Sequence, residues 1–472
     1  MLILNIYRNI PKPNYFNKLN SEIIMENADN VNYKSSLKLY KRAKKVITGG
    51  VSRNTIFRRP HPFYVAQAKG SYVTDIDGNT RIDFANNMAS LIHGHSHPVI
   101  VDAVTEQMQN GTAYTLGSEV EVEFGELLVE RNKEFERIRF VNSGTEAVMS
   151  MIKAARAYTG RPKIAKAEGA YHGTYDFAEI SQIAEPHNWG DIDKPNSVPV
   201  TYGTPESVKK DVVVFPYNDI ERTINLLEAN KSELACVLID PISHRVGMYP
   251  IEEKFLLEIY NWTRKNKVLL VFDEVVTYRV TYSGAQNLYP VKPDMTALGK
   301  IIGGGFPVGA IAGSAKIMSV FDPTRKVIKQ PHSGTFSANP VTMIAGKTAM
   351  QLYDRQAVEN INKMAEIAKK QIHEAIQLAD VPVAITGAGS MFRLHFRQEQ
   401  PRNYRETYQA PEERKVIVDL LDYLFLHENL ILINTFACML ATTITQVEVD
   451  RLSQSLYNGF KKYKAEIHQF AK

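Results

Sequence analysis

The chain has 472 residues, of which 44% are hydrophobic and 23% charged, and this excludes a disulfide-stapled miniprotein, a disordered chain and a fibrous one. Its 56 Lys and Arg against 51 Asp and Glu leave a net charge of +5, which is too thinly spread to argue for a nucleic-acid partner. Composition therefore indicates a folded protein of enzyme size, with roughly two or three domains.

Cysteine usage and the N-terminal residues predict a cytoplasmic protein. Cys236 and Cys438 both lie in apolar stretches, where a thiol is usually buried and reduced. Arg8 and Pro11 interrupt the apolar run at the N-terminus, so we expect neither a signal peptide nor a membrane-spanning segment. Residues 1–30 are polar and predict a loosely packed extension.

In chain order, residues 33–46 predict a basic helix that ends before Gly49 and Gly50. The turn at 77–79 predicts a hairpin between residues 72–76 and 81–84. Strand-like runs then alternate with helical stretches, which is typical of an α/β protein with a mostly parallel sheet covered by helices. These runs are residues 138–141, 212–215, 236–239 and 268–272.

Beyond residue 339 the pattern changes to that of a smaller α+β domain. Helices are predicted over 341–353 and 359–378, and short strands near 390–396 and 430–440. We therefore divide the chain into an extension (1–30), an N-terminal segment of the small domain (31–110), a large domain (111–339) and a C-terminal small domain (340–472).

Three groups of residues could carry chemistry, and the first is Ser143-Gly144-Thr145. An apolar strand runs into this turn and a helix follows it, so free backbone N–H groups at the helix N-terminus could bind a phosphate. The alternative is an ordinary helix cap formed by Ser143 or Thr145.

The second and third groups are Asp273 and Lys300. Asp273 ends an apolar strand, where open α/β sheets place ligand contacts, although a lone Asp there is often a turn cap. Lys300 is flanked by Gly299 and by glycines at 303–305, which permit close approach of a ligand, although most lysines are solvated surface charges. An enclosed lysine can form a Schiff base with a carbonyl. A phosphate cradle, a strand-end Asp and an enclosed Lys are together the three groups that pyridoxal 5′-phosphate requires.

With these residues in place, the sequence resembles the class III, fold type I, pyridoxal-phosphate-dependent aminotransferases. The branch is the one that contains glutamate-1-semialdehyde aminomutase and β-phenylalanine aminotransferase. The resemblance extends from about Tyr40 to Arg451. It rests on the segments 70–78, 93–98, 140–147, 155–160, 169–173, 272–275, 298–305 and 332–336.

The resemblance implies a role for each matching residue. Lys300 forms the Schiff base with the cofactor and moves the proton, and Asp273 keeps the pyridine nitrogen protonated. The phosphate is held by Ser143, Gly144 and Thr145. Tyr171 stacks on the cofactor ring, Val275 supports its other face, and His172 lies beside it or has a packing role. Thr335 reaches the phosphate of the neighbouring subunit's cofactor, so a homodimer with shared active sites is expected.

The three histidines at 93, 95 and 97 do not have a recognised zinc spacing, and the matching family loop binds no metal, so we predict no metal site.

Substrate recognition is predicted from fewer residues. The resemblance favours Arg53 as the group that binds a substrate carboxylate, as in the β-phenylalanine enzyme, although it could also be a surface-loop arginine. The segment 434–438 lacks the second charged group that both relatives have there, and Arg245 or Arg279 could supply the charge instead. Tyr278 and Phe436 could line an aromatic pocket, although aromatic residues more often lie in the core.

The expected function is an aminotransferase that moves an amino group from a β-amino acid or amine to a keto acid, by a ping-pong mechanism through pyridoxamine phosphate. The alternative is an aminomutase-like isomerase with the same cofactor. A racemase and a cofactor-free binding protein are two further hypotheses, and the sequence favours them less than the aminotransferase or the aminomutase. The expected partners are small-molecule substrates and a second subunit, with neither nucleic acid nor membrane.

Overall fold

The computed structural model describes residues 33–470, so the extension predicted over 1–30 lies outside the described residues. The chain forms two compact units. In the described range, residues up to 67 together with 74–80 form the first unit, and residues 68–73 together with 81–470 form the second. The domain boundaries expected near 110 and 339 remain predictions.

The first unit contains the helix predicted near the N-terminus, α1 (Lys34–Ala43), followed by single helical turns at Thr48–Gly50 and Asn54–Ile56. The Asp77 carboxylate accepts the backbone N–H groups of Ser35 and Ser36 at 2.6 and 2.9 Å, and so caps the start of α1. A Cβ on Gly50 would lie 2.5 Å from the Tyr40 ring, which explains the small residue after the helix.

A small sheet contains the predicted hairpin. Its strands lie in the order β1-β2-β3-β13, with bounds Val65–Lys69 (β1), Tyr72–Asp75 (β2), Thr80–Asp83 (β3) and Leu430–Ile431 (β13). The last strand pairs in parallel with β3, so residues 348 positions apart in the sequence share one sheet.

The large sheet confirms the predicted fold class. Its seven strands lie in the order β4-β10-β9-β8-β7-β5-β6, and all neighbouring pairs are parallel except those made by β10. The strands are β4 (Arg137–Val141), β5 (Lys163–Ala167), β6 (Val212–Phe215), β7 (Leu234–Ile239), β8 (Leu269–Asp273), β9 (Met295–Gly299) and β10 (Gly309–Gly313).

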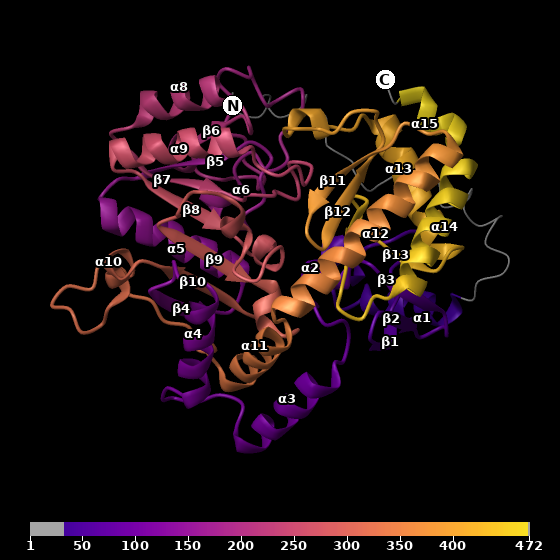
Figure 1. The fold of residues 1–472 in the computed structure, drawn as a ribbon, viewed down its shortest axis with the longest axis horizontal. Helices are drawn as coiled ribbons and strands as arrows, with labels where there is room; N and C mark the ends of the chain where they lie inside the picture. Colours follow the sequence, from indigo (N-terminus) through magenta and orange to yellow (C-terminus); the bar gives the residue numbers. More distant parts are fainter. Residues whose placement is uncertain (1–32, 471–472) are drawn as a thin grey trace, which may run out of the picture. The chain divides into compact units, whose positions relative to one another are not determined.

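Helices cover both faces of this sheet (Figure 1). Along β7, Cys236 and Leu238 belong to the core beneath α5 (Gly144–Thr159), whereas Val237 and Ile239 belong to the core that includes α9 (Glu253–Asn266). Because side chains alternate between the two faces of a strand, an uninterrupted apolar run fits a sheet buried on both faces. Further helices of this region are α6 (Asp176–Glu179), α7 (Glu206–Lys210), α8 (Ile220–Asn230) and α10 (Ala315–Met318).

The C-terminal part of the second unit combines long helices with a three-stranded sheet (Figure 1). That sheet has the order β11-β12-β14, with bounds Ala384–Ala388, Met391–His395 and Ala437–Met439. Its helices are α11 (Pro340–Leu352), α12 (Arg355–Ala379), α13 (Pro411–Leu426), α14 (Gln446–Lys462) and α15 (Lys464–Phe470), and earlier in the chain come α2 (Asn86–Ala89), α3 (Pro98–Asn110) and α4 (Glu119–Arg131). Within residues 33–470, no helix is both long and apolar enough to cross a membrane.

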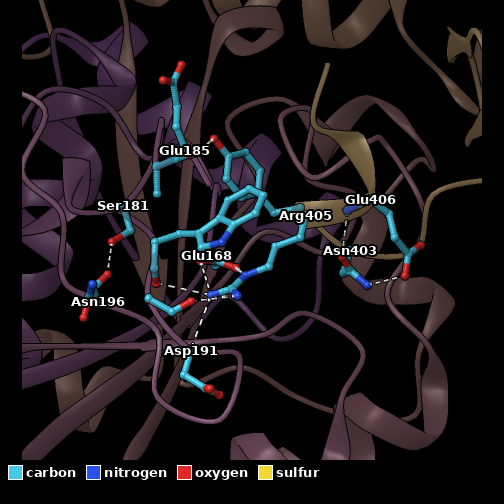
Figure 2. A network of polar contacts seen from close by, with 12 residues as sticks. Glu168, Ser181, Glu185, Asp191, Asn196, Asn403, Arg405 and Glu406 are labelled. Carbon is cyan, nitrogen blue, oxygen red and sulfur yellow. Dashed lines mark hydrogen bonds and ion pairs between the residues drawn. The ribbon is translucent and has the colours of Figure 1, made fainter. Parts of the chain in front are cut away.

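One arginine joins the segment after β12 to the loops that follow β5 (Figure 2). The Arg405 guanidinium forms hydrogen bonds of 2.8 and 3.0 Å with the two carboxylate oxygens of Glu168, and it also donates to the carbonyls of Trp189 and Gly190. The Glu168 side chain is 2% exposed. This carboxylate is therefore removed from water and depends on Arg405 for its charge balance.

Replacement of Arg405 by alanine is expected to lower the free energy of unfolding by about 3–5 kcal/mol, because it leaves a buried carboxylate unpaired. The matched control is Arg402→Ala, which removes an exposed ion pair with Glu252 and should cost about 0–1 kcal/mol. Denaturant unfolding of both variants measures the difference. Equal losses would mean that the Arg405–Glu168 pair has no special weight in the fold.

Candidate active site

Three strands of the large sheet bring the predicted chemical groups to one edge. Gly309 of β10 pairs with Val141 at the end of β4 and with Gly299 at the end of β9. Asp273 ends β8, which runs parallel to β9. The turn after β4, the Asp273 carboxylate and Lys300 therefore all follow strand ends on the same side of the sheet.

The turn Ser143–Thr145 begins α5 and packs directly against the next chemical group. Ser143 Oγ accepts the Glu146 N–H at 3.1 Å, so the ordinary capping role is present. A Cβ on Gly144 would lie 2.7 Å from Val275, which shows how closely the turn approaches the segment that follows β8. The N–H groups of Gly144 and Thr145 belong to the first helical turn, where no intrahelical acceptor exists.

Asp273 is buried and oriented by two hydrogen bonds. Its Oδ1 accepts the backbone N–H of Val275 at 3.0 Å, and its Oδ2 lies 2.8 Å from His172 Nδ1. Burial lowers the pKa of His172, so the ring is neutral and Nδ1–H donates to the carboxylate. The remaining nitrogen, Nε2, is buried without a partner among residues 33–470.

Lys300 adopts an unusual backbone conformation beside two carboxylates. Its φ of +48° lies in the left-handed region, which costs a non-glycine residue about 1 kcal/mol and is characteristic of functional positions. Burial lowers the pKa of Lys300, while Asp273 and Asp240 oppose that shift. Burial also raises the pKa of Asp240 well above its usual range, and the charge on Asp273 adds to this effect. The Lys300 amine is therefore more readily deprotonated than a surface lysine.

The loop after β5 carries Tyr171 and His172. Tyr404 packs over its start, since a Cβ on Gly169 would lie 1.9 Å from the Tyr404 ring. Within the loop, Lys166 Nζ donates to the carbonyl of Ala170 at 3.0 Å, and burial lowers the pKa of Lys166 to about 7. Tyr171 itself is 42% exposed. The loop is thus fixed at its base while the tyrosine ring remains accessible.

A second loop, residues 244–247 beyond β7, is attached to the three-stranded sheet. His244 contributes two contacts to this attachment: its carbonyl accepts Arg393 Nη1 at 3.0 Å, and its Nε2 lies 2.9 Å from Thr435 Oγ1. Thr386 Oγ1 donates to the Gly247 carbonyl at 2.5 Å. Sequence reasoning missed Arg393, and the available signal was a charged residue within the apolar run 391–396.

Two expected substrate residues lie in the interior of the protein. Tyr278 is fully buried and its ring lies 6.4 Å from that of Phe135, and Phe436 is fully buried with its ring 4.9 Å from that of Phe396. Both aromatic side chains belong to the hydrophobic core, and their contact with a substrate stays a prediction. Arg279 is also buried and donates to Ser390 Oγ and to the Leu440 carbonyl, so it has a structural role.

The remaining predicted residues lie elsewhere. Thr335 is exposed on the second unit. Arg53 belongs to the first unit, just before the helical turn Asn54–Ile56, and its role stays a prediction.

His93 hydrogen-bonds to the Ala349 carbonyl at 2.9 Å and to Thr442 at 3.0 Å. Among residues 33–470, no group of three or more His, Cys, Asp or Glu side chains is arranged to hold a metal ion.

The fold and the edge of the sheet define an enzyme of the pyridoxal-phosphate class with fold type I architecture. Residues 56–431 match the class III aminotransferases, and the chain belongs to this family.

Similar proteins include transaminases and an aminomutase. A glutamate-1-semialdehyde 2,1-aminomutase from Methanothermobacter thermautotrophicus is 37% identical over 78% of this chain and 85% of its own. An omega-transaminase from Sphaerobacter thermophilus is 42% identical, with a TM-score of 0.89 over 92% of this chain and 99% of its own. A β-phenylalanine aminotransferase from Variovorax paradoxus is 29% identical, with a TM-score of 0.81 over 92% and 95%.

Pyridoxal 5′-phosphate is the cofactor of this enzyme, and a similar transaminase, 36% identical, has been solved with it bound. The site residues fit this group. The first turn of α5 offers the backbone N–H groups of Gly144 and Thr145 to a phosphate, the Asp273 carboxylate can face a ring nitrogen, and Lys300 lies close enough to Asp273 to interact with its charge.

Gly144→Ala is expected to weaken pyridoxal phosphate binding by at least about tenfold, because the methyl group displaces the turn from Val275 and from the sheet edge. Titration of the apoenzyme with the cofactor, followed by absorbance, measures this affinity. Thr159→Ala, at the far end of α5, is the control and should bind like the wild type. Unchanged affinity in Gly144→Ala would remove this turn from the phosphate site.

Proposed function

We propose that this enzyme is a transaminase that moves an amino group from a carboxylate-bearing amine, with β-amino acids as the favoured class, to a keto acid. The observation that carries the proposal is the convergence of Lys300, Asp273 and the α5 N-terminus at one sheet edge. The 42% identical omega-transaminase, which this chain covers almost completely, supports transfer between two molecules. The β-phenylalanine aminotransferase supports the substrate class.

Pyridoxal phosphate supplies an aldehyde that binds the amine and a ring that accepts the electrons of the broken C–H bond. Lys300 Nζ would hold the cofactor aldehyde in the resting enzyme, and once the substrate amine has displaced it, the freed amine would be placed to carry a proton from the substrate carbon. Its lowered pKa suits this exchange, since an amine must be unprotonated to attack a carbonyl or to accept a proton.

Asp273 and the α5 N-terminus hold the two ends of the cofactor. The Asp273 carboxylate keeps a proton on the ring nitrogen, and the His172 hydrogen bond at 2.8 Å fixes the direction of its Oδ2. The N–H groups of Gly144 and Thr145, together with the Ser143 side chain, bind the phosphate. Tyr171 would stack on one face of the cofactor ring, and Val275 would support the other.

The second candidate is an intramolecular aminomutase. The observation that favours it is the sequence similarity to a glutamate-1-semialdehyde 2,1-aminomutase, which is 37% identical over 370 residues. The same residues would perform both reactions, and the difference is whether the first carbonyl product leaves before the amino group is returned. The distinguishing measurement is therefore the fate of the amino group.

Wild-type enzyme given β-phenylalanine and pyruvate is expected to form alanine and the β-keto acid, while it leaves glutamate-1-semialdehyde unchanged. Lys300→Ala should lose about 10²–10⁴-fold in rate, which is the contribution of a positioned proton-transfer group, and should lose the absorbance of lysine-bound cofactor with its fold intact. Amino-group transfer by nitrogen-15 labelling and circular dichroism measure these results. Conversion of glutamate-1-semialdehyde to 5-aminolevulinate without an external acceptor would instead establish the aminomutase.

We further propose a homodimer whose active sites are shared. Apolar side chains lie exposed on α4, on the segment before α4 and on the segment before α11, and they include Leu116 (83% exposed), Val122 (60%) and Phe336 (60%). A cleft between these elements is lined by Val122, Arg139 and His332, close in sequence to Thr335. Such a surface is typical of a subunit interface. Thr335 would then reach the neighbouring subunit's cofactor phosphate.

Mixed dimers of Thr335→Ala and Lys300→Ala subunits test this arrangement. If Thr335 serves the neighbouring subunit, each mixed dimer has one complete site, and equal mixing should restore about a quarter of the wild-type rate. Turnover after dissociation and reassociation of the two inactive variants measures the recovery. No recovery, with dimers formed, would place Thr335 in its own subunit's site or outside both sites.

A further inference from the structure

Two arginines beside the active site have no acidic partner. Arg393 is 5% exposed, and its one hydrogen bond, from Nη1, goes to the carbonyl of His244 at 3.0 Å. Its Nε is buried without a partner. The partly buried Arg245 lies with its guanidinium carbon 5.6 Å from the Tyr171 ring centre. Among residues 33–470, neither forms an ion pair.

The surroundings of these arginines carry excess positive charge. Burial lowers the pKa of Arg393 to about 10, and Arg245 and Arg397 act in the same direction while Glu413 opposes it. Arg397 is itself paired with Glu413 at 3.6 Å. Burial of an unpaired cation costs several kcal/mol, and an anion bound between the two arginines would offset that cost.

Their position connects them to the reacting groups. His244 adjoins Arg245 in the chain and accepts the Arg393 hydrogen bond, and its pKa is lowered to about 3 by burial and by the charges of Arg393, Arg245 and Lys300. Strand register also places Arg393 opposite Ala437. Arg393 therefore lies beside the segment 434–438, which in this chain has no charged side chain.

We propose that Arg245 and Arg393 together bind the carboxylate of the amino donor and of the keto acid, and so determine the specificity of this enzyme for carboxylate-bearing substrates. This inference rests on the proposed transaminase function. The planar guanidinium of Arg393 offers a fork of donors that matches a carboxylate, and Arg245, beside Tyr171, adds a second charge on the open side. The β12 arginine replaces a charge that the 434–438 segment does not carry.

Binding of an unreactive pair of ligands tests the proposal apart from turnover. 3-Phenylpropanoate and its neutral amide differ only in the carboxylate, and calorimetry on the pyridoxal phosphate-loaded enzyme measures their affinities. The wild type should prefer the carboxylate by at least about tenfold, because hydrogen bonds to charged groups are the stronger ones. Arg393→Gln and Arg245→Gln should each lose most of that preference, and Arg393→Lys should keep part of it.

Arg397→Gln is the matched control, since this neighbouring arginine is held by Glu413 and by the Tyr408 carbonyl, and it should retain the preference. In steady-state assays, Arg393→Gln should raise the KM for pyruvate and β-phenylalanine about 10–100-fold, while a carboxylate-free donor such as 1-phenylethylamine changes less than about twofold. Thermal midpoints and cofactor absorbance confirm that the variants are folded and loaded.

A carboxylate preference that survives in both glutamine variants would overturn the proposal, and so would equal losses of affinity for the acid and for the neutral ligand. A changed absorbance of the resting Arg245→Gln enzyme, with unchanged ligand preference, would also overturn it, because that result would assign Arg245 to the cofactor. A wild type that transfers no amino group, yet shows the preference, would refute the transaminase function and leave the anion site intact.

Discussion

The close packing of three strand ends is the constraint on which the rest of the site depends. Gly144 lies against Val275, Gly309 pairs with both Val141 and Gly299, and no added methyl group fits at Gly144 without a shift. Protein interiors are packed too densely to absorb such a shift without cost. The α5 N-terminus, Asp273 and Lys300 therefore keep fixed relative positions because their backbones are in contact, and the cofactor is bound by a rigid framework.

Charge balance around Lys300 follows from this packing. Burial favours the neutral amine, whereas Asp273 and Asp240 favour the charged one, and the two effects leave the lysine able to exchange a proton. Neutral His172 takes part in this balance because it orients Asp273 without adding a charge. Its unpaired Nε2 and the left-handed backbone of Lys300 are local costs that a ligand-binding site retains for function.

The parts of this arrangement that could be predicted are those with a local signal. Strands β6, β7 and β8 are uninterrupted apolar runs, and the chemical groups follow strand ends directly, so their place on the sheet was foreseeable. Strand β5 was not foreseen, because Lys163 and Lys166 interrupt its pattern, and β10, Gly309–Gly313, reads as a loop. Tyr278 and Phe436 lie in the hydrophobic core, and an aromatic residue near a motif carries no local signal that separates a pocket position from a core position.

Arg393 shows why substrate recognition was harder to predict than the chemistry. Its importance comes from a contact between β12 and the loop after β7, which are about 150 positions apart, and neither segment alone suggests an anion site. The cofactor groups are ordered along one sheet, whereas the substrate groups are assembled from separate elements. A family that keeps the first set can therefore change substrates by moving a charge from one element to another, and in this chain an arginine on a core strand stands next to the segment where a charge is missing.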